Sequence, residues 1–170
     1  SSDVCSSDLA VRNEVLTAIQ PLRKSQNLLI AAGANEVFSF WATQEQTEEL
    51  RELATSKELS QVAARRLALQ TLIGFGTPTL DPAVVSSLDD LIYSNEIQQA
   101  LIKLGGNAEG PILQAWPMVT TAAGKRVLIE VLGQVGGEPS IQLLQQLAES
   151  PDREVRIPAT LAVKKIQSRR

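Results

Sequence analysis

A motif that recurs every 29 to 31 residues constrains the fold of this chain more than any other feature. Each copy has a polar, usually basic, residue followed by apolar or small residues three, six, seven and ten positions later. The copies begin at Arg65, Ser94, Lys125 and Arg156. Such spacings place the apolar residues on one stripe of an α-helix, and this stripe has to be buried. The stretch "REVRIPATLAVKKI", residues 153–166, is thus one copy of at least four.

A second amphipathic segment precedes each copy, so the repeating unit is predicted to be a helical hairpin. These segments are "TEELRELAT", "PAVVSSLDDLIY", "GPILQAWPMV" and "PSIQLLQQLAES". Glycine and proline, such as Gly136 and Gly137 before Pro139, fall between units, where helices must end. We therefore predict an all-α fold built from repeated helical hairpins.

The repeat also predicts how the chain is divided. Four units are expected within residues 44–170, at about 44–76, 77–106, 107–137 and 138–167. Residues 10–43 match the motif loosely and are predicted to be an irregular or degenerate repeat, with two short helices broken near Gly33. Residues 1–9, "SSDVCSSDL", have neither the basic start nor the apolar centre of a secretory signal. They are predicted to be a non-native or disordered tail, on a fragment of a longer protein.

Composition and charge narrow the classes of function. The net charge of -3 argues against a general binder of nucleic acids or anionic membranes. Histidine is absent and Cys5 is the single cysteine, so Cys/His zinc sites and C-x-x-C-H haem attachment have no ligands here. No apolar run reaches the ~18 residues of a membrane span. We expect a soluble chain without metal or cofactor, cytoplasmic or periplasmic depending on its missing N-terminus.

The sequence also offers no reaction centre. The glutamates of "EQTEELRE" lie at i, i+3, i+4 and i+7, which predicts a solvated helix face; they are Glu45, Glu48, Glu49 and Glu52. Asp89 and Asp90 are adjacent carboxylates, but nothing near them suggests the unequal, buried pair that hydrolysis requires. "VTTAAGKRV" lacks the first glycine of a phosphate-binding loop. We predict that the chain is not an enzyme and has no catalytic residues.

Two groups of residues are candidates for partner binding. Phe38, Phe40 and Trp41 form the aromatic cluster of the irregular segment. Trp116 lies at a predicted helix end, and a role in the core or as a cap is its alternative. The repeated basic positions Arg65, Lys125 and Arg156 would suit an anionic ligand or an acidic segment. Ion pairs or carbonyl contacts between units are the alternative, and Ser94, which interrupts the series, favours it.

The motif resembles a known repeat family. "EVRIPATLAVKKI" is similar to the second helix of a HEAT repeat, and "KRVLIEVLGQVG" is similar to the short bacterial variant. The resemblance covers residues 44–167 well and 10–43 loosely. Pro158 departs from the pattern and predicts a kink or a late start of the last helix. The resemblance implies an α-solenoid of stacked helical hairpins. It also implies a non-catalytic scaffold that binds another protein or a neighbouring domain of its parent chain and is monomeric in isolation.

Two alternatives come from looser likenesses. "NEIQQALIKLGGNAEGPILQAWPMVTTAAGKRVLIEVLG" resembles HEAT regions of large exported proteins of planctomycete type, which carry sugar-dehydrogenase-like and c-type haem domains. This likeness implies an accessory segment of an exported redox protein. Short bacterial HEAT repeats also occur in bilin lyases, which gives a chromophore enzyme as a second alternative. Both rest on analogy of fold.

Overall fold

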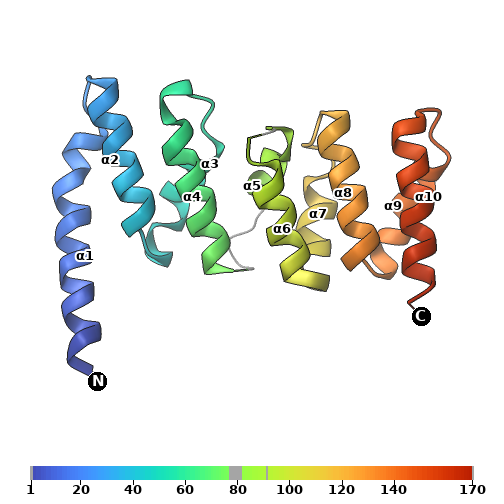
Figure 1. Cartoon of the computed structure of the whole chain (residues 1–170), viewed down its shortest axis with the longest axis horizontal. Coiled ribbons are helices and arrows are strands. Elements are labelled where there is room, and N and C mark those ends of the chain that lie inside the picture. The colour runs from blue at the N-terminus through green and yellow to red at the C-terminus, as the bar shows by residue number, and fades with distance from the viewer. Residues whose placement is uncertain (1, 77–81, 91, 170) are drawn as a thin grey trace. The chain divides into compact units, whose positions relative to one another are not determined.

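The computed structural model describes residues 2–76, 82–90 and 92–169, with side chains from residue 10 onward, and this part of the chain is helical without strands. The described residues form two compact units, 1–75 and 76–170. Within each unit, consecutive helices pack on one another as hairpins (Figure 1). The prediction of an all-α, repeat-like fold is therefore confirmed.

The first unit contains two helical hairpins. Its helices are α1 (Ser2–Arg23), α2 (Leu28–Trp41), α3 (Thr47–Thr55) and α4 (Val62–Phe75), with short 3-10 turns η1 (Gln44–Gln46) and η2 (Leu59–Gln61) before the last two. α1 packs on α2, α3 packs on α4, and α2 lies against α4. The second helices of the two hairpins are therefore neighbours.

The second unit contains three hairpins. Its elements are α5 (Pro82–Ser86), η4 (Ser87–Asp89), α6 (Ser94–Leu104), η5 (Gly105–Ala108), α7 (Glu109–Ala115), α8 (Ala122–Val135), α9 (Glu138–Ala148) and α10 (Arg153–Gln167). α8 packs on both α6 and α10, whereas α7 packs on both α5 and α9. First helices thus form one row and second helices another. The unit expected at 77–106 begins with residues 77–81, which lie outside the described residues.

The buried residues follow the stripe that the motif predicts. In α8, Leu128, Val131 and Leu132 are fully buried, and Ile97 and Leu101 occupy the matching positions of α6. In α10 the same face is made by smaller residues, Ala159 and Ala162. Each fully buried leucine or isoleucine stabilises the fold by about 1.5–3 kcal/mol relative to exposure. Within the second unit, this apolar seam holds the hairpins together.

Three local expectations differ from the structure. α2 runs without interruption through Gly33, whose surroundings are open, and its start is set by Asn27, whose side chain accepts hydrogen bonds from Leu29 and Ile30. The break near Gly33 was therefore predicted wrongly, because packing on α1 and α4 outweighs the modest helix penalty of one glycine.

The N-terminal tail also differs from its expectation. α1 begins at Ser2, so residues 2–9 belong to a helix rather than to a disordered tail. Their non-native origin stays a prediction.

The last helix likewise begins earlier than Pro158 predicts. α10 starts at Arg153, where Asp152 accepts a hydrogen bond of 2.9 Å from the backbone N–H of Glu154. Because Pro158 is only the sixth residue of the helix, its missing N–H removes a single bond near the start. The N-cap at Asp152 fixes the first turn despite the proline.

Two carboxylates tie each hairpin of the second unit to the next. Asp89 Oδ2 accepts hydrogen bonds of 2.7 Å and 2.8 Å from the backbone N–H and hydroxyl of Thr120. Its Oδ1 accepts 3.1 Å and 2.7 Å bonds from the same groups of Thr121, the N-cap of α8. Similarly, Glu109 Oε1 accepts bonds from the backbone N–H groups of Gly137 and Ser140 and from the Ser140 hydroxyl. These acceptors orient the beginnings of α8 and α9.

Asp89 makes the stability of this link depend on pH. Burial raises the pKa of Asp89, but the hydrogen bonds from Thr120 and Thr121 outweigh it and bring the pKa below its ordinary value. The contribution is therefore fully present above the unfolded pKa of about 3.9 and is lost as pH falls through the lower pKa of the folded state. We expect the stability difference between the wild type and Asp89→Asn to shrink as pH drops below about 4. Urea denaturation from pH 7 to pH 2.5 measures it, and a constant difference would contradict this assignment.

Candidate interaction groove

An open groove lies between α8 and α10, in the row of second helices of the second unit. Its volume is about 500 Å³. The residues that line it are Arg126, Glu130, Gly133, Gln134, Arg153, Glu154, Ile157, Pro158, Leu161, Ala162 and Lys165. All of them come from two neighbouring helices, so the groove is built entirely within one unit.

The floor of the groove is formed where Gly133 of α8 lies against Ala162 of α10. A Cβ atom added to Gly133 would lie 3.0 Å from the Cβ of Ala162. Glycine on α8 and alanine on α10 therefore let the two backbones come close and leave a hollow above them. Arg169 holds the C-terminal end of α8, because its guanidinium donates hydrogen bonds to the carbonyls of Gly133, Gln134 and Gly136.

Two aliphatic side chains of α10 line the groove without being buried. Ile157 is 45% exposed and Leu161 is 53% exposed, although the face of α10 that packs in the core carries Ala159 and Ala162. They lie one helical turn apart and on the groove side. Exposed aliphatic residues are unremarkable singly, but paired in a hollow they offer apolar area to a ligand.

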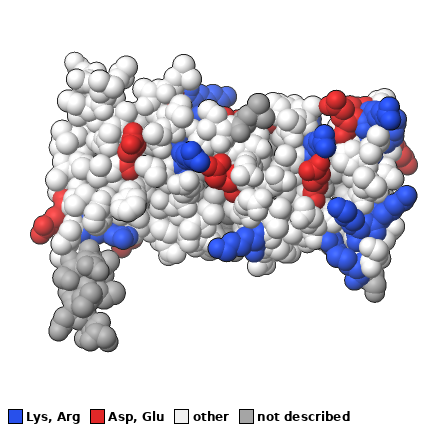
Figure 2. Space-filling view, in the orientation of Figure 1, with Lys and Arg blue, Asp and Glu red and all other residues white. Residues whose placement is uncertain are grey.

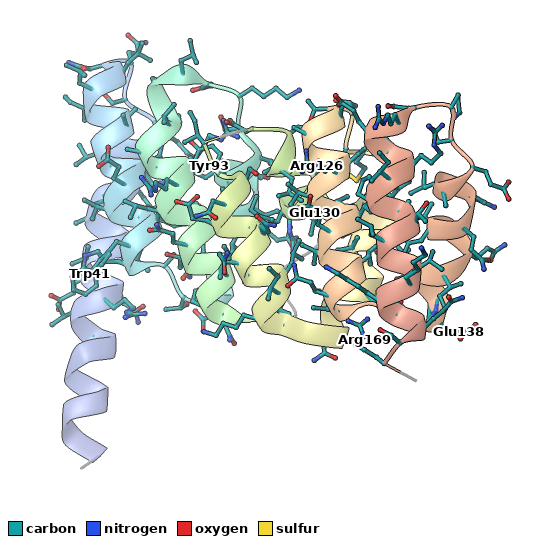
Figure 3. The ribbon with its side chains drawn as sticks, turned by 45° about the vertical axis from the view of Figure 1, so that its right-hand side comes forward. Trp41, Tyr93, Arg126, Glu130, Glu138 and Arg169 are labelled. Carbon is teal, nitrogen blue, oxygen red and sulfur yellow. The ribbon has the colours of Figure 1, made fainter. Side chains whose placement is uncertain are left out.

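Charged side chains of both signs surround these aliphatic residues. Figure 2 shows acidic and basic groups gathered over α8 and α10. Arg126 Nε lies 2.9 Å from Glu130 Oε1 one turn further along α8, and both residues are labelled in Figure 3. The hydrogen bond and charge of Glu130 raise the pKa of Arg126, and the charge of Glu154 adds to this effect. In the described part of the chain, no ion pair or hydrogen bond involves the side chains of Arg153 or Lys165.

The repeated basic residues contact their own hairpins. Arg65 Nε donates a 3.4 Å hydrogen bond to the carbonyl of Ala54, and Arg156 Nη1 donates a 3.0 Å bond to the carbonyl of Ser150. Lys125 Nζ lies 5.8 Å from the centre of the Trp116 ring. For Lys125 and Arg156 these contacts lie inside single hairpins, whereas the sequence suggested contacts between units. None of the three basic residues lines the groove between α8 and α10.

The aromatic cluster is divided by the helix that carries it. Phe38 is fully buried, and the Cζ atom of Arg23 lies 3.5 Å from the centre of its ring. Phe40 is 68% exposed and packs edge-on against Trp41, with ring centroids 5.9 Å apart. Positions two apart on a helix point to opposite sides, so one face could not hold both phenylalanines. Phe38 is thus a core residue and was wrongly proposed as a partner contact, while Phe40 and Trp41 keep partly exposed rings.

Trp116, the other tryptophan proposed for partner binding, lies at the end of a helix. Trp116 is the C-cap residue of α7, and its half-buried ring lies beneath Lys125.

One of the four glutamates on the predicted solvated face belongs to a polar network in the first unit. Glu49 forms an ion pair of 2.5 Å with Arg23. Arg23 also donates a 2.8 Å hydrogen bond to Asn35, whose amide donates to Gln61. No sequence pattern marks this polar network, because its members come from four separate elements.

The groove itself had a signal in the sequence. Ile157 and Leu161 are apolar residues of the last copy that do not belong to the predicted buried stripe at Ala159, Ala162 and Val163. Apolar residues outside the core stripe of an amphipathic helix indicate a second apolar contact. The pattern does not predict that α8 faces these residues, nor that Gly133 of α8 leaves the hollow between the two helices.

Comparisons with known proteins bring no relative to this site. The chain matches no family model, no curated protein and no solved structure. Among the described residues, no helix has the length and apolar character to cross a bilayer, and no three Cys, Asp or Glu side chains are placed to hold a metal ion. The HEAT resemblance therefore stays a proposal, and the function has to be argued from the groove.

Proposed function

We propose that this chain is a non-catalytic scaffold of HEAT-like repeats that holds a segment of another protein, or of a neighbouring domain, in the groove between α8 and α10. The observation that carries the proposal is the pair of exposed aliphatic residues, Ile157 and Leu161, set in a hollow of about 500 Å³. Stacked hairpins provide a rigid row of helices on which such a segment can lie.

The character of the groove favours a polypeptide ligand. It is open along two helices, and its apolar strip is bordered by charged side chains such as Glu130 and Lys165. Protein interfaces share this anatomy, an apolar centre within a polar rim. An amphipathic segment could bury its apolar side chains against the strip while its polar groups remain at the rim.

The test is selection of binding peptides on the purified chain. A phage library of random peptides would be selected on the wild type, and the isolated peptides measured by fluorescence anisotropy. In the variant Ile157→Gln/Leu161→Gln, we expect binding to weaken at least about tenfold, because two apolar contacts are replaced by polar ones without a change of charge. Since both positions are exposed, the fold should survive, which circular dichroism would verify.

A matched control replaces two exposed leucines elsewhere. Leu29 and Leu59 are 85% and 89% exposed in the first unit, and the variant Leu29→Gln/Leu59→Gln should bind the selected peptides as the wild type does. Failure to enrich any peptide, or equal weakening in both double variants, would refute the groove as the binding site.

A further inference from the structure

We infer that the segment held between α8 and α10 is an acidic amphipathic helix, with carboxylates at both ends of a short apolar stripe. This inference rests on the proposed function and specifies the chemistry of its ligand. It follows from the order of side chains along α10, from the charges of the groove that have no partner, and from the scarcity of amide groups on its walls.

The groove side of α10 has a regular pattern. Arg153, Ile157, Leu161 and Lys165 follow one another at intervals of four residues, and all four line the groove. Residues four apart lie on nearly the same side of a helix, so the order along the groove is basic, apolar, apolar, basic. At 1.5 Å per residue, the first and last of these positions are about 18 Å apart along the axis.

The charges of the groove leave an excess at the two ends of this pattern. The lining side chains include three cations and two carboxylates. Arg126 is bonded to Glu130, and the charge of Glu154 adds to its stabilisation. Arg153 and Lys165 have no such partner among the described residues. A ligand with carboxylates near these two positions would complement them.

The side chains that line the groove favour a helical ligand, because few of them can form hydrogen bonds with a peptide backbone. Gln134 provides the one side-chain amide among the lining residues. An extended segment would bring unpaired backbone N–H and C=O groups into a groove that has few amides to receive them. A helix satisfies its own backbone hydrogen bonds and needs only side-chain contacts. With the same spacing of four residues, its acidic, apolar, apolar and acidic positions would lie opposite those of α10.

The inference is tested with two peptide libraries that share one helical frame of about thirteen residues, long enough to span about 18 Å. Apolar residues are varied at the fifth and ninth positions. The first and thirteenth positions are glutamate in one library and lysine in the other. Selection on the wild type should enrich the glutamate library, and its peptides should bind about tenfold more tightly than their lysine counterparts, as two partly exposed ion pairs allow.

Charge reversal in the protein provides the second half of the test. In Arg153→Glu/Lys165→Glu the preference should invert, so that lysine peptides bind more tightly than glutamate peptides. The control Lys57→Glu/Lys164→Glu has the same net charge but alters exposed residues that do not line the groove, and it should keep the preference for glutamate. Raising the salt concentration should reduce the preference in the wild type.

The outcomes separate this inference from the proposed function. Peptides that depend on Ile157 and Leu161 but bind equally well with either flank, or whose preference survives Arg153→Glu/Lys165→Glu, would overturn the acidic ligand and leave the scaffold in place. Bound peptides that show no helical circular dichroism would overturn the helical form. Peptides that bind equally to Ile157→Gln/Leu161→Gln would overturn the function and the inference together.

Discussion

Replacement of Phe38 with alanine is expected to lower the free energy of unfolding of the first unit by about 3–5 kcal/mol. The ring is fully buried between helices, so its removal leaves a cavity as well as losing apolar burial. Its removal also deprives the Arg23 guanidinium, 3.5 Å from the ring centre, of a cation–π contact in a poorly hydrated place. This is the largest single effect that we expect in this unit.

The neighbouring aromatic residue supplies the control. Phe40 is 68% exposed, and Phe40→Ala should change the free energy of unfolding by no more than about 0.5 kcal/mol. Trp41 lies in the same unit and Trp116 in the other, so urea denaturation in backgrounds with one tryptophan replaced by phenylalanine follows the two units separately. Equal losses for the two alanine variants would show that Phe38 is not the core residue the structure makes it.

Replacement of Asp89 with alanine is expected to lower the free energy of unfolding of the second unit by about 1.5–3 kcal/mol. The carboxylate accepts bonds from two backbone N–H groups and two hydroxyls at the start of α8. Without the carboxylate, these four donors must form hydrogen bonds with water. The replacement also removes a negative charge from a helix N-terminus, where negative charge is stabilising. Trp116 fluorescence during urea denaturation would measure the change.

An aspartate that caps only its own helix provides the comparison. Asp152 accepts one bond, from the N–H of Glu154, and is exposed. Asp152→Ala should therefore cost about 1 kcal/mol, the usual value for an N-cap. If the two alanine variants lose the same stability, the bonds that Asp89 accepts from Thr120 and Thr121 add nothing to an ordinary cap, and the link between hairpins has no energetic role.

A change at Gly124 would disturb the same link from its other side. A Cβ atom there would lie 2.6 Å from Asp89 Oδ1 and 2.7 Å from Val119 Cγ1. The carboxylate therefore occupies space that only glycine leaves free at the start of α8. This explains why a helix-unfavourable residue stands in the first turn after the N-cap Thr121.

Local sequence patterns predict the helices of the four repeats and the faces that these helices bury. The spacing of three and four residues in the motif fixes which side of each helix must leave water, and residues such as Ile97, Leu128 and Ala159 are buried as that spacing requires. Hairpins follow from the breakers between the segments. These features are local, because helical periodicity and turn chemistry involve residues within a few positions of one another.

Tertiary structure alone decided the contacts between hairpins and hence the candidate site. Asp89 reaches Thr120 and Thr121 across 31 and 32 residues, and Gly133 lies against Ala162 at the floor of the groove. No local pattern marks such pairs, since the motif records that a helix has a buried side but not which atoms lie opposite it. Phe38 and Phe40 illustrate this limit. Helical periodicity predicts that the two rings lie on opposite sides of α2, but only the packing of α2 on α1 and α4 determines which ring is buried and which is exposed.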